Sequence, residues 1–285
     1  MTDTSSLVLD DPFPGLLVDT AWLADHLSHP GLRILQIGGE SHYPRLHIPG
    51  AALLSLTDLV ALRNGVPGMR ADQALLAERF GRAGVTTGAP VLVYDVGSGM
   101  DAARAAWTLA SLGHPSVAVL DGGLGIWYRE NRPMTPEPPP ARLDTFLPRP
   151  QPAWEATTAQ VVEASRPGQP VLLLDTRTPQ EYQGLTLREP RGHIAGARLF
   201  NWTDALRDPQ DPRLKDPATL SMLFAQVGAV ERQQEMIVYC ETGHRAAHTW
   251  LLLRHLGFTR VRLYDGSMAE WRLLGYPVVA GSNPR

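Results

Sequence analysis

The second half of this chain repeats the first half. Four pairs of segments match in the same order, and the two members of each pair lie 144 to 146 residues apart. The matching pairs are residues 47–51 with 193–197, 91–95 with 236–240, 112–114 with 256–258, and 120–123 with 264–267. Because chance rarely preserves both order and spacing, the sequence predicts one domain that is present twice in tandem.

A proline-rich segment separates the two halves. Eight prolines lie between residues 132 and 153, and proline lacks the backbone donor that a helix or a central strand needs. We therefore expect a semi-rigid, extended linker at 132–153. It divides the chain into an N-terminal domain at 15–131 and a C-terminal domain at 154–281, and a length of 285 residues suits two domains.

Each half alternates short apolar segments with helical patterns. In the second half, continuous apolar runs predict strands at 171–174, 236–239 and 261–264. Apolar residues at helical spacing predict helices at 219–227 and 246–256. Strands that are apolar throughout are typical of a parallel sheet with both faces covered. The predicted fold class is α/β, with two domains that each hold a mainly parallel sheet flanked by helices on both faces.

Composition excludes several classes of function. A formal net charge of −3 gives no indication of a basic surface for nucleic acid, and no apolar run is as long as a membrane helix. We therefore expect neither nucleic acid nor a membrane as a partner. The start of the chain lacks the pattern of a signal peptide, and a single cysteine cannot form an internal disulfide, so we expect a cytoplasmic location. Nine histidines and one cysteine show no metal-ligand spacing, and we expect no metal or cofactor.

The single cysteine ends a predicted strand and begins a polar loop that leads into a predicted helix. The loop residues are Cys240, Glu241, Thr242, Gly243, His244 and Arg245. Backbone N–H groups in such a loop can curl toward the thiol and, with the helix N-terminus, stabilise an anion there. Arg245 adds a permanent positive charge and His244 a titratable one, and both favour thiolate over thiol. Thr242 can donate a hydroxyl hydrogen bond, Gly243 permits the sharp backbone path, and Glu241 is expected to point to solvent.

A lone cysteine after a buried strand can also be an inert core residue. The polar loop and the adjacent Arg245 favour a reactive Cys240 over that alternative.

The order of motifs resembles that of the tandem-domain rhodaneses, the thiosulfate and 3-mercaptopyruvate sulfurtransferases. The motifs are residues 174–177 with 181–182, 192–197, 240–245, and 265–267 with Trp271. The resemblance covers residues 17–279 and is strongest to bacterial two-domain thiosulfate sulfurtransferases. It implies two rhodanese domains, of which the N-terminal one is inactive and the C-terminal one catalytic. The sequence agrees, since Asp95 stands where Cys240 stands in the other half, and an aspartate cannot carry sulfane sulfur.

The resemblance also implies a ping-pong mechanism without a cofactor. Cys240 would take the outer sulfur of a donor such as thiosulfate and pass it, from a persulfide, to cyanide or to a thiol. Arg245 would bind the anionic donor, and the loop N–H groups would hold the persulfide. Five further residues are candidates for support of the site: Asp175, Arg177, Arg188, Arg191 and Trp202. Asp175, together with Arg177, is expected to hydrogen-bond loop backbone. Arg188 and Arg191 are expected either to supply positive charge to the site or to be ordinary solvated residues. Trp202 is expected either to line the cleft or to pack in the core.

The loop sequence favours thiosulfate as the donor. Mercaptopyruvate enzymes resemble one another in a small, uncharged loop, whereas Glu241, His244 and Arg245 are charged or titratable. Those enzymes, and vertebrate thiosulfate enzymes, have an arginine at the position of Glu181, and a glutamate cannot hold the carboxylate of mercaptopyruvate.

Three other functions stay open at this point. One is a 3-mercaptopyruvate sulfurtransferase, and another is a persulfide carrier that delivers sulfur to a partner protein. The third is a cysteine-dependent phosphatase, whose loop also holds an anion over a thiolate and ends in arginine. The phosphatase loop has one residue more between cysteine and arginine than the four between Cys240 and Arg245, and the shorter loop suits a single sulfur atom better.

Overall fold

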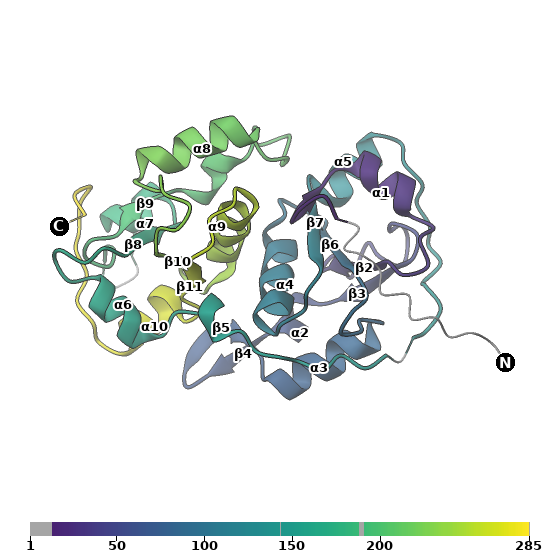
Figure 1. Cartoon of the computed structure of the whole chain (residues 1–285), viewed down its shortest axis with the longest axis horizontal. Helices are drawn as coiled ribbons and strands as arrows, with labels where there is room; N and C mark the ends of the chain where they lie inside the picture. Colours follow the sequence, from purple (N-terminus) through teal and green to yellow (C-terminus); the bar gives the residue numbers. More distant parts are fainter. Residues whose placement is uncertain (1–12, 143, 188–190, 285) are drawn as a thin grey trace.

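The computed structural model describes residues 13–142, 144–187 and 191–284. The chain forms two α/β domains, one on each side of the proline-rich segment (Figure 1). Each domain is built on a sheet whose strand pairs are all parallel, with helices on both faces, so the predicted fold class is confirmed.

The N-terminal domain has a five-stranded sheet with the order β1-β7-β6-β2-β3. Its strands are β1 (Leu17–Val18), β2 (Arg33–Ile37), β3 (Ala51–Leu54), β6 (Val91–Asp95) and β7 (Val117–Leu120). Its helices are α1 (Thr20–His26), α2 (Leu56–Leu59), α3 (Gln73–Arg82), α4 (Met100–Ser111) and α5 (Gly123–Arg129). Alternate residues of β6 face opposite layers: Val93 packs with α3 and α4, whereas Leu92 and Tyr94 pack with α1 and α5.

The C-terminal domain has a four-stranded sheet with the order β11-β10-β8-β9. Its strands are β8 (Leu172–Asp175), β9 (Arg198–Leu199), β10 (Met236–Tyr239) and β11 (Val261–Leu263). Its helices are α6 (Thr158–Ala164), α7 (Pro179–Gln183), α8 (Pro217–Gln226), α9 (His244–His255) and α10 (Ser267–Leu273), with 3₁₀ turns η1 (Pro152–Trp154) and η2 (Trp202–Ala205). Helix α8 begins at Pro217, two residues before the predicted helix at 219–227, and the Asp216 side chain caps it.

One continuous apolar core joins the two domains. Helices α4 and α9 lie side by side at the centre of the molecule (Figure 1), and Trp107 of α4 and Trp250 of α9 belong to the same buried cluster. Each of these helices begins directly after the loop that follows a central strand, β6 or β10. The shared core therefore brings the two strand-to-helix loops toward the same interface.

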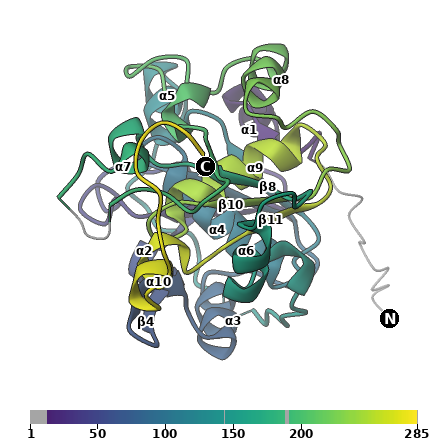
Figure 2. The same cartoon turned by 90° about the vertical axis from the view of Figure 1, so that its left-hand side faces the viewer.

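An antiparallel hairpin extends the N-terminal domain toward the other domain. Strands β4 (Val60–Arg63) and β5 (Val66–Arg70) form it, and it packs against α10 (Figures 1 and 2). Gly65 at its turn lies against Leu273 of α10. The repeat did not predict this hairpin.

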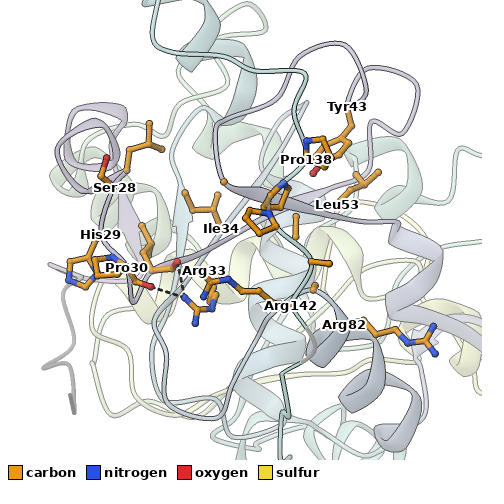
Figure 3. A pocket seen from close by; sticks show the side chains of 18 residues that line it. Ser28, His29, Pro30, Arg33, Ile34, Tyr43, Leu53, Arg82, Pro138 and Arg142 are labelled. Carbon is orange, nitrogen blue, oxygen red and sulfur yellow. Dashed lines mark hydrogen bonds between the residues drawn. The ribbon is translucent and has the colours of Figure 1, made fainter. Parts of the chain in front are cut away.

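The proline-rich segment is extended, and it is also anchored to the N-terminal domain. Phe146 is buried against Phe80, and the backbone N–H groups of Asp144 and Arg149 donate to Gly81 and Leu112. The segment closes a cavity of about 410 Å³ in which Arg33 and Arg142 lie close together (Figure 3). This cavity is lined by residues of the N-terminal domain and the linker only, so it is separate from the loop at Cys240.

Candidate active site

Cys240 lies at the carboxyl end of β10, the expected position for a ligand site in a parallel sheet. Its neighbour Tyr239 pairs in register with Asp175 at the end of β8. Cys240 is 1% exposed. The thiol is therefore enclosed by the loop and by the elements packed against it.

Ser267, the first residue of α10, fixes the path of the loop. Its hydroxyl accepts hydrogen bonds from the backbone N–H groups of Cys240 and Gly243, both at 3.1 Å, and donates to the carbonyl of Tyr264. Gly243 has φ of 80°, and a Cβ at this position would lie 2.7 Å from a guanidinium nitrogen of Arg104. Only glycine fits there, and α9 begins immediately after it, so the N–H groups of its first turn face away from the helix body.

Arg245 forms a bidentate ion pair with Glu181 of α7. The two guanidinium nitrogens lie 2.6 and 2.9 Å from the two carboxylate oxygens. Burial by itself raises the pKa of Glu181, but the hydrogen bonds and the charge of Arg245 outweigh burial and lower that pKa to about 2. The same carboxylate caps α7 through Thr178. Arg245 also interacts electrostatically with Cys240, so one guanidinium is coupled both to the nucleophile and to the Glu181 carboxylate.

The Arg245–Glu181 pair should make the protein more stable at neutral pH than in acid. The pKa of Glu181 is lowered from its ordinary value of 4.5 in the folded state, so its contribution is present above about pH 5 and is lost as pH falls toward 2. At pH 7 we expect Glu181→Gln to lower the free energy of unfolding by about 1–3 kcal/mol, after allowance for partial exposure. Urea unfolding at several pH values measures this difference, which should shrink in acid.

Glu163 offers a matched control for this substitution. It lies in α6 and pairs with Arg166 just after the helix, and both side chains are exposed. Glu163→Gln should therefore change the free energy of unfolding by less than about 0.5 kcal/mol. Equal effects of the two substitutions would contradict a special role for the Glu181–Arg245 pair.

Glu241 does not point to solvent, and that prediction is wrong. Its carboxylate lies 2.6 and 2.8 Å from one guanidinium nitrogen of Arg272 in α10, and 4.0 Å from Arg177. The reason is that α10 packs beside the loop and presents Arg272 to it, a contact between residues 31 positions apart.

His244 does not add a positive charge at neutral pH. Burial is the largest cause that lowers its pKa, to about 4, and the nearby charge of Arg104 lowers it further. Its imidazole lies 3.6 Å from Asp101 of α4, whose own pKa is raised to about 6 by burial and by neighbouring carboxylates. The N-terminal domain thus covers this side of the loop.

Thr242 faces the same domain through the hairpin. A Cβ on Gly68 would lie 2.9 Å from the Cβ of Thr242, so the hairpin backbone packs directly on this side chain.

Four of the predicted supporting residues can be placed. Arg177 donates to both carboxylate oxygens of Asp175 and to the carbonyl of Gly192, and both charged side chains are buried. Arg191 is exposed, and Trp202 is half-buried with its ring edge-on to His248. Arg188 lies outside the described residues. The Asp175–Arg177 pair therefore braces the start of α7, which carries Glu181.

In the N-terminal domain, the side chain of Asp95 fills the loop that corresponds to Cys240–Arg245 of the other domain. The buried carboxylate of Asp95 accepts four backbone hydrogen bonds at 2.9–3.1 Å. The donors are Gly97, Gly99, Asp101 and Ala102. A loop at this position of the fold is thus able to hold an anion at the end of the central strand.

Sequence reasoning missed several residues that shape the site. Glu181 and Arg272 were not recognised as partners of loop residues, nor was Arg104 as a neighbour of Gly243. Ser267 belongs to a quoted motif, and its counterpart in the first half is Gly123. That glycine-to-serine difference, at a backbone position with positive φ in both halves, is a signal that the sequence does contain.

Within residues 13–142, 144–187 and 191–284, no three histidine, cysteine or acidic side chains gather as metal ligands. No helix in that part of the chain is long and apolar enough to cross a membrane.

Comparison with known proteins identifies the family. The family model of the rhodanese-like domain matches residues 19–130 and 157–274. A thiosulfate sulfurtransferase of Corynebacterium glutamicum is 32% identical, over 96% of this chain and 96% of that protein. The sulfur carrier protein TtuD of Thermus thermophilus is also 32% identical, over 94% and 98% of the two chains.

A solved structure agrees with this likeness. SseA from Escherichia coli, a 3-mercaptopyruvate sulfurtransferase, superposes with a TM-score of 0.78 at 28% identity and covers 89% of this chain and 98% of its own. The chain therefore belongs to the rhodanese family of sulfurtransferases, with two rhodanese-like domains in tandem.

Proposed function

We propose that this protein is a thiosulfate sulfurtransferase that carries sulfane sulfur as a persulfide on Cys240. The main support for the proposal comes from the loop that follows β6 in the N-terminal domain and the loop that follows β10 in the C-terminal domain. The N-terminal loop holds the Asp95 carboxylate with four N–H groups, and the C-terminal loop offers Cys240 at the same strand end. A persulfide is also anionic at its outer sulfur, so it suits the same kind of loop.

The first step loads the enzyme. The Cys240 thiolate attacks the outer sulfur of thiosulfate, a new S–S bond forms, and the S–S bond within thiosulfate breaks. Sulfite leaves with the electron pair of that bond. Arg245 keeps N–H donors beyond the two bound to Glu181, and we assign it to the sulfonate oxygens, where negative charge accumulates.

The second step unloads it. Cyanide, or the thiolate of an acceptor, attacks the outer sulfur of the persulfide and forms thiocyanate or an acceptor persulfide. The S–S bond to Cys240 breaks, and Cys240 leaves as the thiolate. Both steps transfer sulfur without an external oxidant or reductant.

The ion pairs around the loop favour thiosulfate over mercaptopyruvate. Arg245, Arg272 and Arg177 each have a carboxylate partner of the same domain. The resemblance implies an arginine at the position of Glu181 in mercaptopyruvate enzymes, and a glutamate cannot hold the carboxylate of mercaptopyruvate as that arginine would. The remaining N–H donors of Arg245 suit the sulfonate oxygens of thiosulfate.

A second candidate role is delivery of the sulfur to a protein thiol. It is favoured by the 32% identity to a protein named as a sulfur carrier. Both roles use the same persulfide and differ only in the acceptor.

Mass spectrometry tests the proposal. After incubation with thiosulfate, the intact protein should gain the mass of one sulfur atom, and cyanide should remove it. Protein whose Cys240 has been alkylated beforehand is the control and should gain nothing. Turnover of mercaptopyruvate far above thiosulfate would overturn the donor, and hydrolysis of an aryl phosphate without a sulfur adduct would overturn the reaction class.

A further inference from the structure

The two domains hold each other through a contact that occurs twice. Asp265, which precedes α10, accepts a hydrogen bond of 2.7 Å from the backbone N–H of Arg70 in the N-terminal domain. Asp121, which precedes α5, accepts one of 3.0 Å from the backbone N–H of Leu214 in the C-terminal domain. An offset of 144 residues relates both donors and both acceptors (70 to 214, 121 to 265). The interface therefore has two equivalent halves. Only the half that contains Asp265 lies next to the loop that carries Cys240.

The two halves differ in one buried side chain. Arg104 of α4 reaches Asp265 at 2.6 Å, donates to the carbonyl of Gly68, and has no exposed surface. The same offset of 144 leads from Arg104 to His248 of α9. Burial lowers the pKa of His248 to about 4, so it is uncharged at neutral pH. The half of the interface next to the Cys240 loop thus contains a buried permanent cation, Arg104. The other half has the neutral imidazole of His248 at the equivalent position.

Arg104 lies directly against the loop that carries Cys240. A Cβ on Gly243 would lie 2.7 Å from a nitrogen of Arg104 and 2.9 Å from an oxygen of Asp265. Two residues after Asp265, the Ser267 hydroxyl accepts the N–H groups of Cys240 and Gly243. The Arg104–Asp265 ion pair therefore packs against the loop at Gly243. It also lies next to the start of α10, whose Ser267 holds the loop by hydrogen bonds.

The charge of Arg104 also acts within the loop. After burial, it is the strongest influence that lowers the pKa of His244, and it exceeds the opposite effect of Asp265. His244 is the first residue of α9 and belongs to the loop that begins at Cys240. At His244 the charge of Arg104 therefore outweighs that of Asp265, and a net positive effect of this kind favours an anion.

We propose that Arg104 of the N-terminal domain is a positioning residue for Cys240, and that the domain without a nucleophile controls the reactivity of the thiol through it. The inference rests on the proposed function only in taking Cys240 as the nucleophile. It assigns the N-terminal domain a part in the chemistry, beyond covering the cleft.

Other charged groups near the loop already have partners of their own. From the C-terminal domain these are Arg245 with Glu181, Arg272 with Glu241, and Arg177 with Asp175. From the N-terminal domain and the start of the C-terminal one they are Asp101 beside His244, and Arg70 with Glu155. A substitution at Arg104 leaves these contacts in place and removes one cation.

Alkylation of the single cysteine tests the proposal without any sulfur donor. The rate of reaction of Cys240 with iodoacetamide is measured against pH in the wild type, Arg104→Gln and Arg104→Lys. In Arg104→Gln the carboxylate of Asp265 loses its cation, so the profile should move to higher pH and the rate at pH 7 should fall about threefold or more. Arg104→Lys keeps the charge and should restore part of the rate. With thiosulfate, kcat should fall more than KM rises, because Arg104 does not touch the donor.

Asp121→Asn is the matched control, since it alters the equivalent contact in the other half of the interface. Its alkylation profile should coincide with that of the wild type. If Arg104→Gln does not fold, Asp265→Asn replaces it; this substitution leaves the Arg104 cation without its carboxylate, so the alkylation profile should then move to lower pH, and an unchanged profile would overturn the proposal. A wild-type profile in folded Arg104→Gln, or an equal shift in Asp121→Asn, would overturn the proposal. A wild type that reacts with iodoacetamide but gains no sulfur from thiosulfate would overturn the proposed function instead.

Discussion

Replacing Cys240 by alanine should abolish sulfur transfer and leave the protein folded. The variant has no thiol at all, because Cys240 is the only cysteine, so neither the persulfide nor any substitute on another cysteine can form. We expect the rate of thiocyanate formation from thiosulfate and cyanide to fall to that of the uncatalysed reaction. The free energy of unfolding should change by only about 1 kcal/mol.

The small effect on stability follows from the duplication. The N-terminal domain builds the same strand, loop and helix with Asp95 at the equivalent position, so the fold does not depend on sulfur. Initial rates and urea unfolding curves measure the two quantities. Retained sulfur transfer in the folded variant would show that Cys240 is not the carrier.

The fold could be predicted well because its signals are local or repeated. The predicted strand at 236–239 coincides with β10, that at 171–174 is shifted by one residue relative to β8, and that at 261–264 ends one residue after β11. A buried parallel strand is apolar throughout, and a helix has its own period, so short segments of sequence suffice. The near-constant offset between the halves then predicts a shared strand order, and the order β7-β6-β2-β3 in the first domain corresponds to β11-β10-β8-β9 in the second.

The arrangement of side chains around the loop could not be predicted in the same way. The pair of Arg245 with Glu181 joins residues 64 positions apart, and Arg104 meets Asp265 from the other domain. Such contacts depend on how helices pack on a sheet and on how two domains dock. Glu241 and His244 illustrate the consequence, because each was assigned a role from its residue type. Arg272 of α10 pairs with Glu241, and burial, together with the charge of Arg104, lowers the pKa of His244.

Replacing Asp95 by asparagine should destabilise the N-terminal domain by about 2–4 kcal/mol. The carboxylate accepts four backbone hydrogen bonds in a buried site. An asparagine keeps one acceptor oxygen but turns an NH₂ group toward two of the donors, which are then left buried without an acceptor. Urea unfolding measures the loss, and hydrogen exchange at Gly97, Gly99, Asp101 and Ala102 localises it to the loop.

Asp19→Asn is the matched control for this charge removal. Asp19 caps α1 by accepting one exposed N–H group, and asparagine caps equally well, so its effect should stay within about 0.5 kcal/mol. Sulfur transfer per folded molecule should be retained in Asp95→Asn, since Cys240 is in the other domain. A loss below about 1 kcal/mol, with unchanged exchange at the four amides, would show that the loop does not depend on an anion at its centre. It would also remove the main support for the view that the equivalent loop at Cys240 is built to hold a persulfide.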